Sequence, residues 1–287
     1  MKSVKGIILD IDGVIVGEKI GYNSPDPHAD VIEKLKSVHQ NGVPIVLCTA
    51  KPHFAITQII EKAELNNVHI TDGGGVIISP IDNVVVEKYV IDDQAAVQKI
   101  LNIYLKNNAY VEIYTVDDYI IQTSQICDVT DQHAHVLQRK PKIVESLIDE
   151  SLHSEITKIM PIATDETDKI RVEKLFKKAQ TNLTLSWGVH PVAWPLQFGI
   201  ITAPGISKKQ SAINVSKILR IPLENMLGVG DGTSDWQFIE LCGYAGVMAN
   251  GSDDLKKLVA QKGQGRCKIG GHVDENGVIE ILDFFLG

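Results

Sequence analysis

A strand and helix alternation opens the chain, stops near residue 76 and returns near residue 196, and this interruption constrains the fold most. The apolar run GIIL at residues 6–9 and the run PIVL at residues 44–47 are each followed by a segment with helical spacing. Strands that alternate with helices are typical of a parallel sheet covered by crossover helices. We therefore expect an α/β fold with a doubly wound, Rossmann-like parallel sheet.

The first two helices are expected at residues 27–40 and at about residues 53–64. Asp26 can cap the first helix, Pro27 suits its first turn, and Asn41-Gly42 provides a stop signal. The sequence therefore contains two complete strand-helix units before the pattern changes.

The interrupting segment is rich in β-branched residues. GVIISPIDNVVVEKYVI and AYVEIYTVDDYIIQTSQI read as strands, and Asp117-Asp118 between two apolar runs predicts a hairpin. Helical patterns at about 92–107, 141–153 and 166–180 are interleaved with strands near 156–163 and 183–189. We expect an α+β domain at residues 82–195, inserted into a core formed by residues 1–81 and 196–287.

The strand and helix alternation returns from FGIITAPGISKKQ onward. Helices are expected at residues 208–219, 235–242 and 253–261, with Ser207 and Ser252 as caps of the first and last. The closing NGVIEILDFFLG reads as an amphipathic helix. The resumed pattern is the basis for predicting an insertion rather than two consecutive domains.

Charge and hydropathy restrict the possible partners. Lysine plus arginine number 28 against 36 acidic residues, a formal charge of −8, and no long basic run is present. We expect no nucleic-acid partner, because such a chain offers no footprint for a phosphate backbone. We expect no membrane partner, because no apolar stretch approaches about 20 residues. The opening MKSVKGIILDID reaches two acids too early for a signal peptide, which predicts a cytoplasmic location.

Cysteine and histidine indicate neither a disulfide framework nor a zinc site. The scattered cysteines, which we expect to be reduced, are Cys48, Cys127, Cys242 and Cys267. His133 and His135 in DQHAH could ligate a metal, but no other ligand-rich segment has matching spacing. We interpret DQHAH as a solvated loop.

Three apolar runs end on groups that can bind phosphate or metal. The first run ends on Asp10 and Asp12, the second on Thr49, and the run NMLGVGD on Asp231. By itself, the first ending is an ordinary turn. Because the carboxyl ends of parallel strands meet at one edge of a sheet, however, these residues can lie together.

Asp10, Asp12, Asp231 and Asp235 would then share one crevice. Two carboxylates about 4 Å apart repel by about 4 kcal/mol at an effective dielectric near 20, so the cluster predicts a cation. Oxygen ligands completed by water are the preference of Mg²⁺. Taken separately, GDGTSD at residues 230–235 is more often a capped turn, and we interpret GGG at residues 73–75 as a turn into the second domain.

Thr49 and Lys208 complement the acids. A hydroxyl at a strand end and an ammonium group at a helix N-terminus are suited to an anion. Lys208 taken alone is an ordinary surface lysine. Together with the four acids, Thr49 and Lys208 predict a binding site for a phosphoryl group.

In this order and spacing, the four motifs resemble those of the haloacid dehalogenase superfamily of phosphotransferases. They are Asp-x-Asp-Gly after the first strand, Thr49, Lys208 in GISKK, and the two acids of GDGTSD. The insertion resembles the subclass IIB caps of Cof-like sugar phosphatases, a group that is also similar to sucrose phosphatase and phosphomannomutase. The resemblance covers the whole chain.

The resemblance implies a role for each motif residue. Asp10 matches the nucleophile that forms an aspartyl-phosphate. Asp12 matches the acid/base, whose backbone carbonyl also faces the metal. Thr49 and Lys208 match the pair that holds phosphate. The magnesium-binding acids correspond to Asp231 and Asp235.

Several positions depart from the family pattern. Val14 stands where threonine is frequent, and Ser234 stands where asparagine usually precedes the last acid. Lys209 replaces a frequent glycine, which leaves either Lys208 or Lys209 as the phosphate ligand. Asp72-Gly73 occupies what is often Asn-Gly, a change that we expect to alter a substrate contact.

The resemblance thus implies a magnesium-dependent phosphomonoester hydrolase that acts on a small phosphorylated metabolite, such as a sugar phosphate. His190 and Trp194, near the second domain seam, are candidate substrate contacts or core residues. The alternatives are a phosphomutase with the same nucleophile and a non-catalytic phosphoacceptor module, which the length of the chain disfavours. No oligomeric state is predicted.

Overall fold

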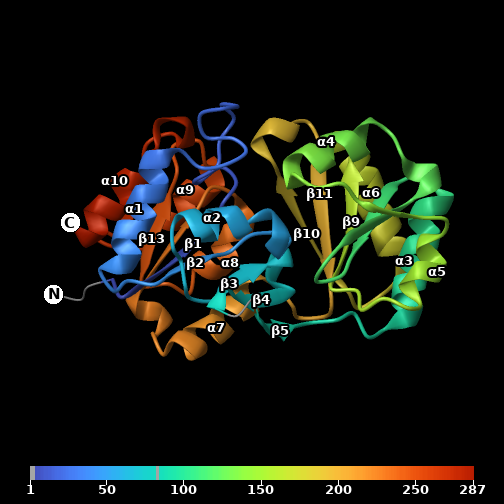
Figure 1. Cartoon of the computed structure of the whole chain (residues 1–287), viewed down its shortest axis with the longest axis horizontal. Helices are drawn as coiled ribbons and strands as arrows, with labels where there is room; N and C mark the ends of the chain where they lie inside the picture. The colour runs from blue at the N-terminus through green and yellow to red at the C-terminus, as the bar shows by residue number, and fades with distance from the viewer. Residues whose placement is uncertain (1–3, 82–83) are drawn as a thin grey trace.

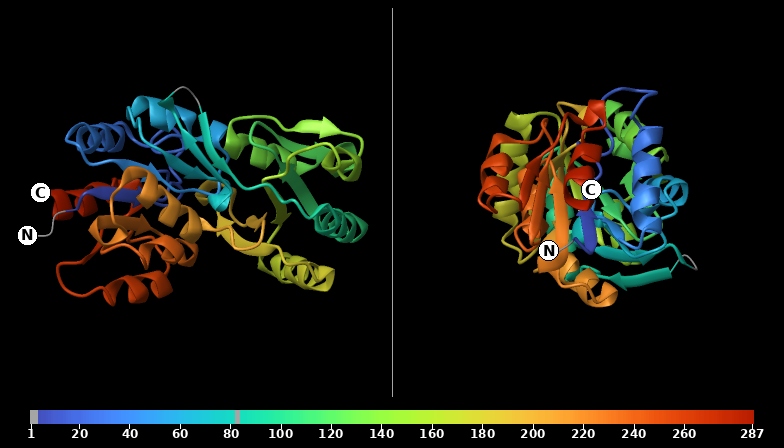
Figure 2. Two further views of the ribbon diagram at one scale, coloured as in Figure 1. Left: turned by 90° about the horizontal axis from the view of Figure 1, so that it is seen from below. Right: turned by 90° about the vertical axis from the view of Figure 1, so that its left-hand side faces the viewer.

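Two lobes lie side by side along the longest axis of the molecule (Figure 1). The computed structural model describes residues 4–81 and 84–287. The described chain begins and ends on the lobe that carries the parallel sheet, which we name the core lobe, at the side away from the other lobe (Figure 2). Residues 94–202 form the second lobe, which we name the cap.

The core lobe contains a five-stranded parallel sheet in the order β14-β13-β12-β1-β2. Its strands are β1 (Gly6–Leu9), β2 (Ile45–Leu47), β12 (Met226–Gly230), β13 (Tyr244–Val247) and β14 (Cys267–Ile269). The chain runs outward from β1 to β2 on one side and from β12 to β14 on the other. The strand order therefore reverses between β1 and β12, where an open α/β sheet forms its ligand-binding crevice.

Helices cover both faces of this sheet, which confirms the doubly wound α/β fold. They are α1 (Ala29–Gln40), α2 (Thr57–Lys62), α7 (Lys208–Leu219), α8 (Trp236–Ile239), α9 (Asp253–Ala260) and α10 (Val278–Leu286). Alternate residues of β1 point to opposite faces. Ile7 and Leu9 pack with α1 and α10, whereas Ile8 packs with α7, α8 and α9.

Helix ends in the core lobe follow the predicted caps except at α1. The hydroxyls of Ser207 and Ser252 accept from backbone N–H groups in the first turns of α7 and α9. The cap of α1 is His28, whose Nδ1 accepts from the N–H of Asp30. The predicted cap, Asp26, lies before the helix start and instead pairs with Lys62 at 2.6 Å.

The cap is built on a six-stranded sheet in the order β10-β11-β9-β6-β7-β8, antiparallel except for the last pair. The strands are β6 (Tyr110–Tyr114), β7 (Tyr119–Gln122), β8 (Lys142–Val144), β9 (Lys158–Ala163), β10 (Thr184–Val189) and β11 (Gln197–Thr202). The hairpin predicted at Asp117-Asp118 is confirmed, since β6 and β7 pair on either side of it.

Helices pack on both faces of the cap sheet. They are α3 (Gln94–Lys106), α4 (Asp128–Leu137), α5 (Leu147–Ser151) and α6 (Glu166–Ala179). The first, third and fourth share one apolar cluster, while α4 packs on the other face together with Ala50 and Phe54 of the core lobe. In the part of the chain described, no helix has the length and apolar character of a membrane span.

Two expectations for the cap are wrong. DQHAH is not a solvated loop but part of α4, where His133 is buried with its Nδ1 2.9 Å from a carboxylate oxygen of Glu112. The helix expected at residues 141–153 is limited to α5, because residues 142–144 pair with β7 as β8. In both places a contact distant in sequence decides the local structure.

A small antiparallel sheet of β3 (His69–Thr71), β4 (Val76–Ser79) and β5 (Val84–Lys88) adjoins β2 through a bridge between Cys48 and Ile70. Because β5 pairs with β4, it belongs with the core lobe, whereas β11 belongs to the cap sheet. The predicted boundary at residue 82 lies outside the described residues. Strand pairing favours an insert between about residues 89 and 203, and this division stays a proposal.

Candidate active site

The candidate active site lies at the reversal of strand order, where three strands of the core sheet end. Asp10 follows β1 directly, Asp231 follows β12, and Thr49 lies just beyond β2. The paired registers bring the strand ends level, since Leu9 lies opposite both Leu47 and Val229. A cavity of about 310 Å³ is lined by Asp10, Asp12, Thr49, Lys208, Asp231 and Ser234 from the core lobe. The structure thus brings these predicted residues together.

Lys208 lies at the centre of the acidic cluster. It is the first residue of α7, and its ammonium group lies 2.8 Å from Oδ1 of Asp10 and 2.7 Å from Oδ1 of Asp235. Lys209 instead pairs with Glu240 at the surface, 2.5 Å away. Of the two adjacent lysines, only Lys208 is therefore placed to hold an anion in the cavity.

Asp235 also fixes the loop that carries Asp231. Its Oδ2 accepts hydrogen bonds from the backbone N–H groups of Asp231 at 3.0 Å and Gly232 at 3.1 Å. On the opposite side, Gly13 has a φ of +78°, and a Cβ there would lie 2.0 Å from Oδ2 of Asp231. The positive φ and the nearby Asp231 carboxylate both favour glycine at residue 13.

The charges in the cluster are unbalanced. One carboxylate oxygen from each of Asp10, Asp231 and Asp235 lies within 4.8 Å of the others. Burial, followed by the nearby charge of Asp235, raises the pKa of Asp10 to about 7. Burial, followed by the charges of Asp235 and Asp10, raises the pKa of Asp231 well above its ordinary value. Burial opposes the charged form of Lys208, but the two acids it contacts raise its pKa well above the usual range. One lysine does not neutralise three carboxylates.

Asp12 has different surroundings from Asp10. Its Oδ1 lies 2.8 Å from the ammonium group of Lys51 and 3.0 Å from Nε2 of the cap residue His190. Burial would raise the pKa of Asp12, but Lys51 and then His190 outweigh it and lower this pKa well below its ordinary value. Burial lowers the pKa of His190, against the opposing charge of Asp12. The two aspartates of the first motif are therefore electrostatically distinct.

The cap completes the walls of the cavity. The cap residues that line it are Lys169, Ser186, Trp187, Gly188, Val189, Gln197 and Ile200. A second cavity of about 50 Å³ adjoins Asp12 and is lined mainly by apolar and aromatic side chains, including Tyr114, Met160 and Phe198. His190 lines this smaller cavity, whereas Trp194 is 71% exposed and lines neither.

The structure also shows where the other residues that depart from the family pattern lie. Val14 is buried in the core cluster, and Ser234 lines the larger cavity. The side chain of Asp72 is fully buried and lines neither cavity described above, whereas Gly73 lines the larger one, so the altered substrate contact expected at Asp72-Gly73 stays a prediction. The carboxylate of Asp72 pairs with Lys158 of the cap.

Sequence reasoning missed Lys51, Gln197 and Lys158. Lys51 follows Thr49 by two residues, so its proximity to the strand end was a usable signal. Lys158 is the one charged residue in the run ITKIMPIA, and a charge at the start of a buried strand suggests a specific partner. Gln197 gives no such signal, because its position depends on the pairing of β11 with β9 and β10.

Comparison with known proteins agrees with this architecture. Phosphatase YwpJ of Bacillus subtilis is 22% identical over 273 residues, which cover 89% of this chain and 93% of YwpJ. The Streptococcus pyogenes protein M6_Spy0533, assigned as a phosphatase, is 22% identical over 268 residues, or 89% and 91% of the two chains.

Solved structures show the same fold. The HAD subclass IIB sugar phosphatase BT4131 superposes with a TM-score of 0.78 at 19% identity, covering 98% of both chains. A haloacid dehalogenase-like hydrolase from B. subtilis gives a TM-score of 0.77 at 21% identity, covering 97% of this chain and 99% of the other.

The family assignment rests on a match across almost the whole sequence. The sequence profile of the haloacid dehalogenase-like hydrolases matches residues 7–282, from β1 into α10, and so includes all four motifs. This protein belongs to the haloacid dehalogenase-like hydrolases.

Proposed function

We propose that the protein is a magnesium-dependent phosphomonoester hydrolase with Asp10 as its nucleophile. The observation that carries this proposal is the convergence of Asp10, Thr49, Lys208 and Asp231 in one cavity at the reversal of strand order. The relatives named as phosphatases support it, as does the fold shared with a sugar phosphatase.

The donor set suits Mg²⁺. Asp10 and Asp231 would supply carboxylate oxygens to the ion, and the family resemblance implies the backbone carbonyl of Asp12 as a further donor. Asp235 adds negative charge and contacts Lys208. Burial, and then the charges of neighbouring acids, raise the pKa values of Asp10 and Asp231, and a divalent cation would favour both carboxylate forms. When bound, the ion would neutralise negative charge on the transferring phosphoryl group.

The side chains divide the reaction into two steps. The carboxylate of Asp10 attacks phosphorus, so that an aspartyl O–P bond forms while the ester P–O bond breaks. Thr49 and Lys208 hold the phosphoryl oxygens, and Asp12 gives its proton to the leaving oxygen. Asp12 then takes a proton from water, which cleaves the aspartyl O–P bond and releases inorganic phosphate.

The contacts of Asp12 fit the second step directly. Lys51 and His190 stabilise its carboxylate form, which is the base that activates water. The first step needs the protonated form. A phosphoryl dianion between Thr49 and Lys208 brings negative charge beside Asp12 and so raises the pKa of this group when substrate binds.

The cavity favours a small metabolite as substrate. A volume of about 310 Å³ is at the lower end of the range for small-molecule sites, and the cap supplies both polar walls and an indole. We propose a sugar phosphate or a related cytoplasmic metabolite, rather than a nucleic acid, as the substrate.

Phosphate release from a panel of sugar, nucleotide and glycolytic phosphates tests this function. We expect release with Mg²⁺, none in excess EDTA, and none from Asp10→Asn under either condition. Full turnover in EDTA would contradict the metal requirement. Isomerisation of a sugar phosphate without phosphate release would identify a phosphomutase, which could use the same nucleophile.

A further inference from the structure

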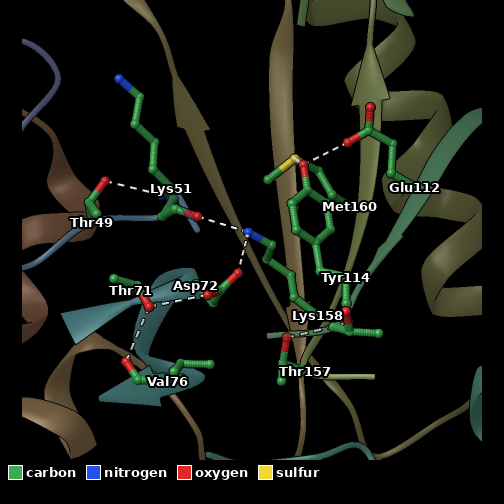
Figure 3. Close-up of polar contacts among 12 residues, drawn as sticks. Thr49, Lys51, Thr71, Asp72, Val76, Glu112, Tyr114, Thr157, Lys158 and Met160 are labelled. Carbon is green, nitrogen blue, oxygen red and sulfur yellow. Dashed lines mark hydrogen bonds and ion pairs between the residues drawn. The ribbon is translucent and has the colours of Figure 1, made fainter. Parts of the chain in front are cut away.

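Lys158 is a cap residue whose side chain is completely buried where the cap meets the core lobe. It begins β9, and its ammonium group lies 2.9 Å from Oδ1 of Asp72 and 2.9 Å from the carbonyl oxygen of Ala50. The ring centre of Tyr114 lies 3.8 Å from the same nitrogen. Figure 3 shows the lysine reaching from β9 toward Asp72 and the backbone beside Lys51. A lysine is rarely buried so completely unless it is paired.

The contacts of Lys158 complete the support of the segment Thr49–Lys51. Backbone N–H groups of Asp72 and Gly73 donate to the last and first carbonyls of this segment, at 2.9 and 3.0 Å. The middle carbonyl, that of Ala50, accepts from the ammonium group of Lys158. All three consecutive carbonyls are thus held, two by the core lobe and one by the cap.

This segment carries groups that the proposed reaction uses. Thr49 lines the larger cavity, and its hydroxyl accepts from the N–H of Lys51 at 3.1 Å (Figure 3). The Lys51 side chain contacts Asp12. A rotation of the intervening peptide would therefore displace both the phosphate-binding hydroxyl and the partner of the acid/base.

A specific contact explains why residue 72 is an aspartate rather than an asparagine. Asp72 has a φ of +54°, a conformation that asparagine and aspartate tolerate better than most residues. Its Oδ1 faces Lys158, while its Oδ2 accepts from the hydroxyl of Thr71 at 3.2 Å. Asparagine would fit the backbone equally well but would leave the buried ammonium without a counter-charge. The pair Asp72 and Lys158 explains the departure from Asn-Gly.

Building on the proposed phosphatase activity, we propose that Lys158 is a positioning residue. Through the Ala50 carbonyl, the cap sets the backbone geometry with which the segment Thr49–Lys51 binds phosphate and orients the acid/base. Asp72 balances the charge of the lysine, and Tyr114 packs against it. The cap therefore helps to fix the backbone of the phosphate-binding segment Thr49–Lys51, in addition to forming a wall of the cavity.

The test separates positioning from simple stabilisation. Lys158→Met keeps the length of the side chain but removes its donors and leaves the Asp72 carboxylate unpaired. The double variant Lys158→Met/Asp72→Asn removes both charges, so it should be more thermally stable than Lys158→Met. It replaces the single variant in the test if Lys158→Met does not fold. We expect both variants to lose kcat by about tenfold or more, and the affinity for inorganic phosphate to fall in parallel.

A matched control changes the next residue of the same strand. Ile159 packs in the cap cluster with α3 and α6, so Ile159→Ala should lower the melting temperature without changing kcat or phosphate affinity well below that temperature. Equal catalytic losses in Ile159→Ala would overturn the proposal, as would wild-type kcat and phosphate affinity in the double variant.

Calorimetric titration with inorganic phosphate needs no turnover. If the wild-type protein released no more phosphate than Asp10→Asn, this result would contradict the phosphatase proposal but not the role of Lys158. The phosphate affinities would then still decide the role of Lys158, with unchanged affinity in the double variant overturning it.

Discussion

At the scale of single residues, the site separates two aspartates that lie only two positions apart. Burial, followed by the charge of Asp235, raises the pKa of Asp10 to about 7, against the opposing charge of Lys208. Asp12 contacts Lys51 and His190, which hold its pKa well below the ordinary range. The motif predicts both residues, but their different environments come from partners elsewhere in the chain.

Binding of Mg²⁺ should release protons. Near pH 7 Asp10 is partly protonated, since its pKa is about 7, and a cation favours the carboxylate form. Calorimetric titration with Mg²⁺ at pH 7, in two buffers of different ionisation enthalpy, should therefore give different apparent enthalpies, and affinity should rise with pH. Asp10→Asn should reduce the number of protons released. Identical enthalpies in both buffers would argue against this view of the cluster.

Removing Lys51 should move the pH profile. Lys51 is the largest influence that lowers the pKa of Asp12, so Lys51→Met should raise that pKa. Because Asp12 is the proposed base of the second step, the acidic limb of the kcat profile should shift to higher pH. Lys209→Met, which removes only a surface pair with Glu240, is the control. An acidic limb at the wild-type position in Lys51→Met would show that Lys51 does not tune Asp12.

At the scale of elements, apolar periodicity and cap residues predict the helices that pack one apolar face against a sheet. Helices α3, α6, α7 and α9 lie within about two residues of their predicted positions, because apolar spacing and cap residues are local signals. β8 and α4 were missed. The first depends on pairing with β7, and the second buries His133 against Glu112, so neither is determined by its own sequence alone.

The strand β3 carries a histidine that should make stability depend on pH. Nδ1 of His69 accepts from the N–H of Leu47, and its Nε2 lies 3.2 Å from the carbonyl oxygen of Leu65, so the neutral ring is the form held. Burial lowers its pKa from 6.5 to about 4. Above pH 6.5 the ring is neutral in both states. Between pH 6.5 and 4 only the unfolded chain binds the proton, which lowers the unfolding free energy by up to about 3 kcal/mol.

Denaturant unfolding of the wild type and of His69→Asn, at several pH values between 4 and 7, measures this contribution. The wild type should lose more stability than the variant as the pH falls, because asparagine does not titrate in this range. Parallel curves for the two proteins would show that His69 is not the group responsible.

At the scale of the whole molecule, the cap and the core lobe meet through charged contacts made by buried side chains. His190 reaches Asp12, and Lys158 reaches Asp72 and the backbone of Ala50. Three of the four core motifs could be predicted because each follows an apolar strand, and Lys208 could be predicted because it begins a helix with a recognisable cap residue. These cross-lobe contacts could not, since their partners are far apart in sequence and depend on how the cap is docked.

The central claim is that Asp10 accepts the phosphoryl group, and trapping the covalent adduct tests it most directly. In Asp12→Asn no base remains to activate water, while an activated leaving group such as p-nitrophenolate needs little protonation. Rapid acid quench of this variant with p-nitrophenyl phosphate and Mg²⁺, followed by peptide mass mapping, should find one added phosphoryl group on Asp10. The double variant Asp10→Asn/Asp12→Asn should carry none. A phosphoryl group mapped to any other residue, or a normal steady-state rate in Asp10→Asn, would contradict the account.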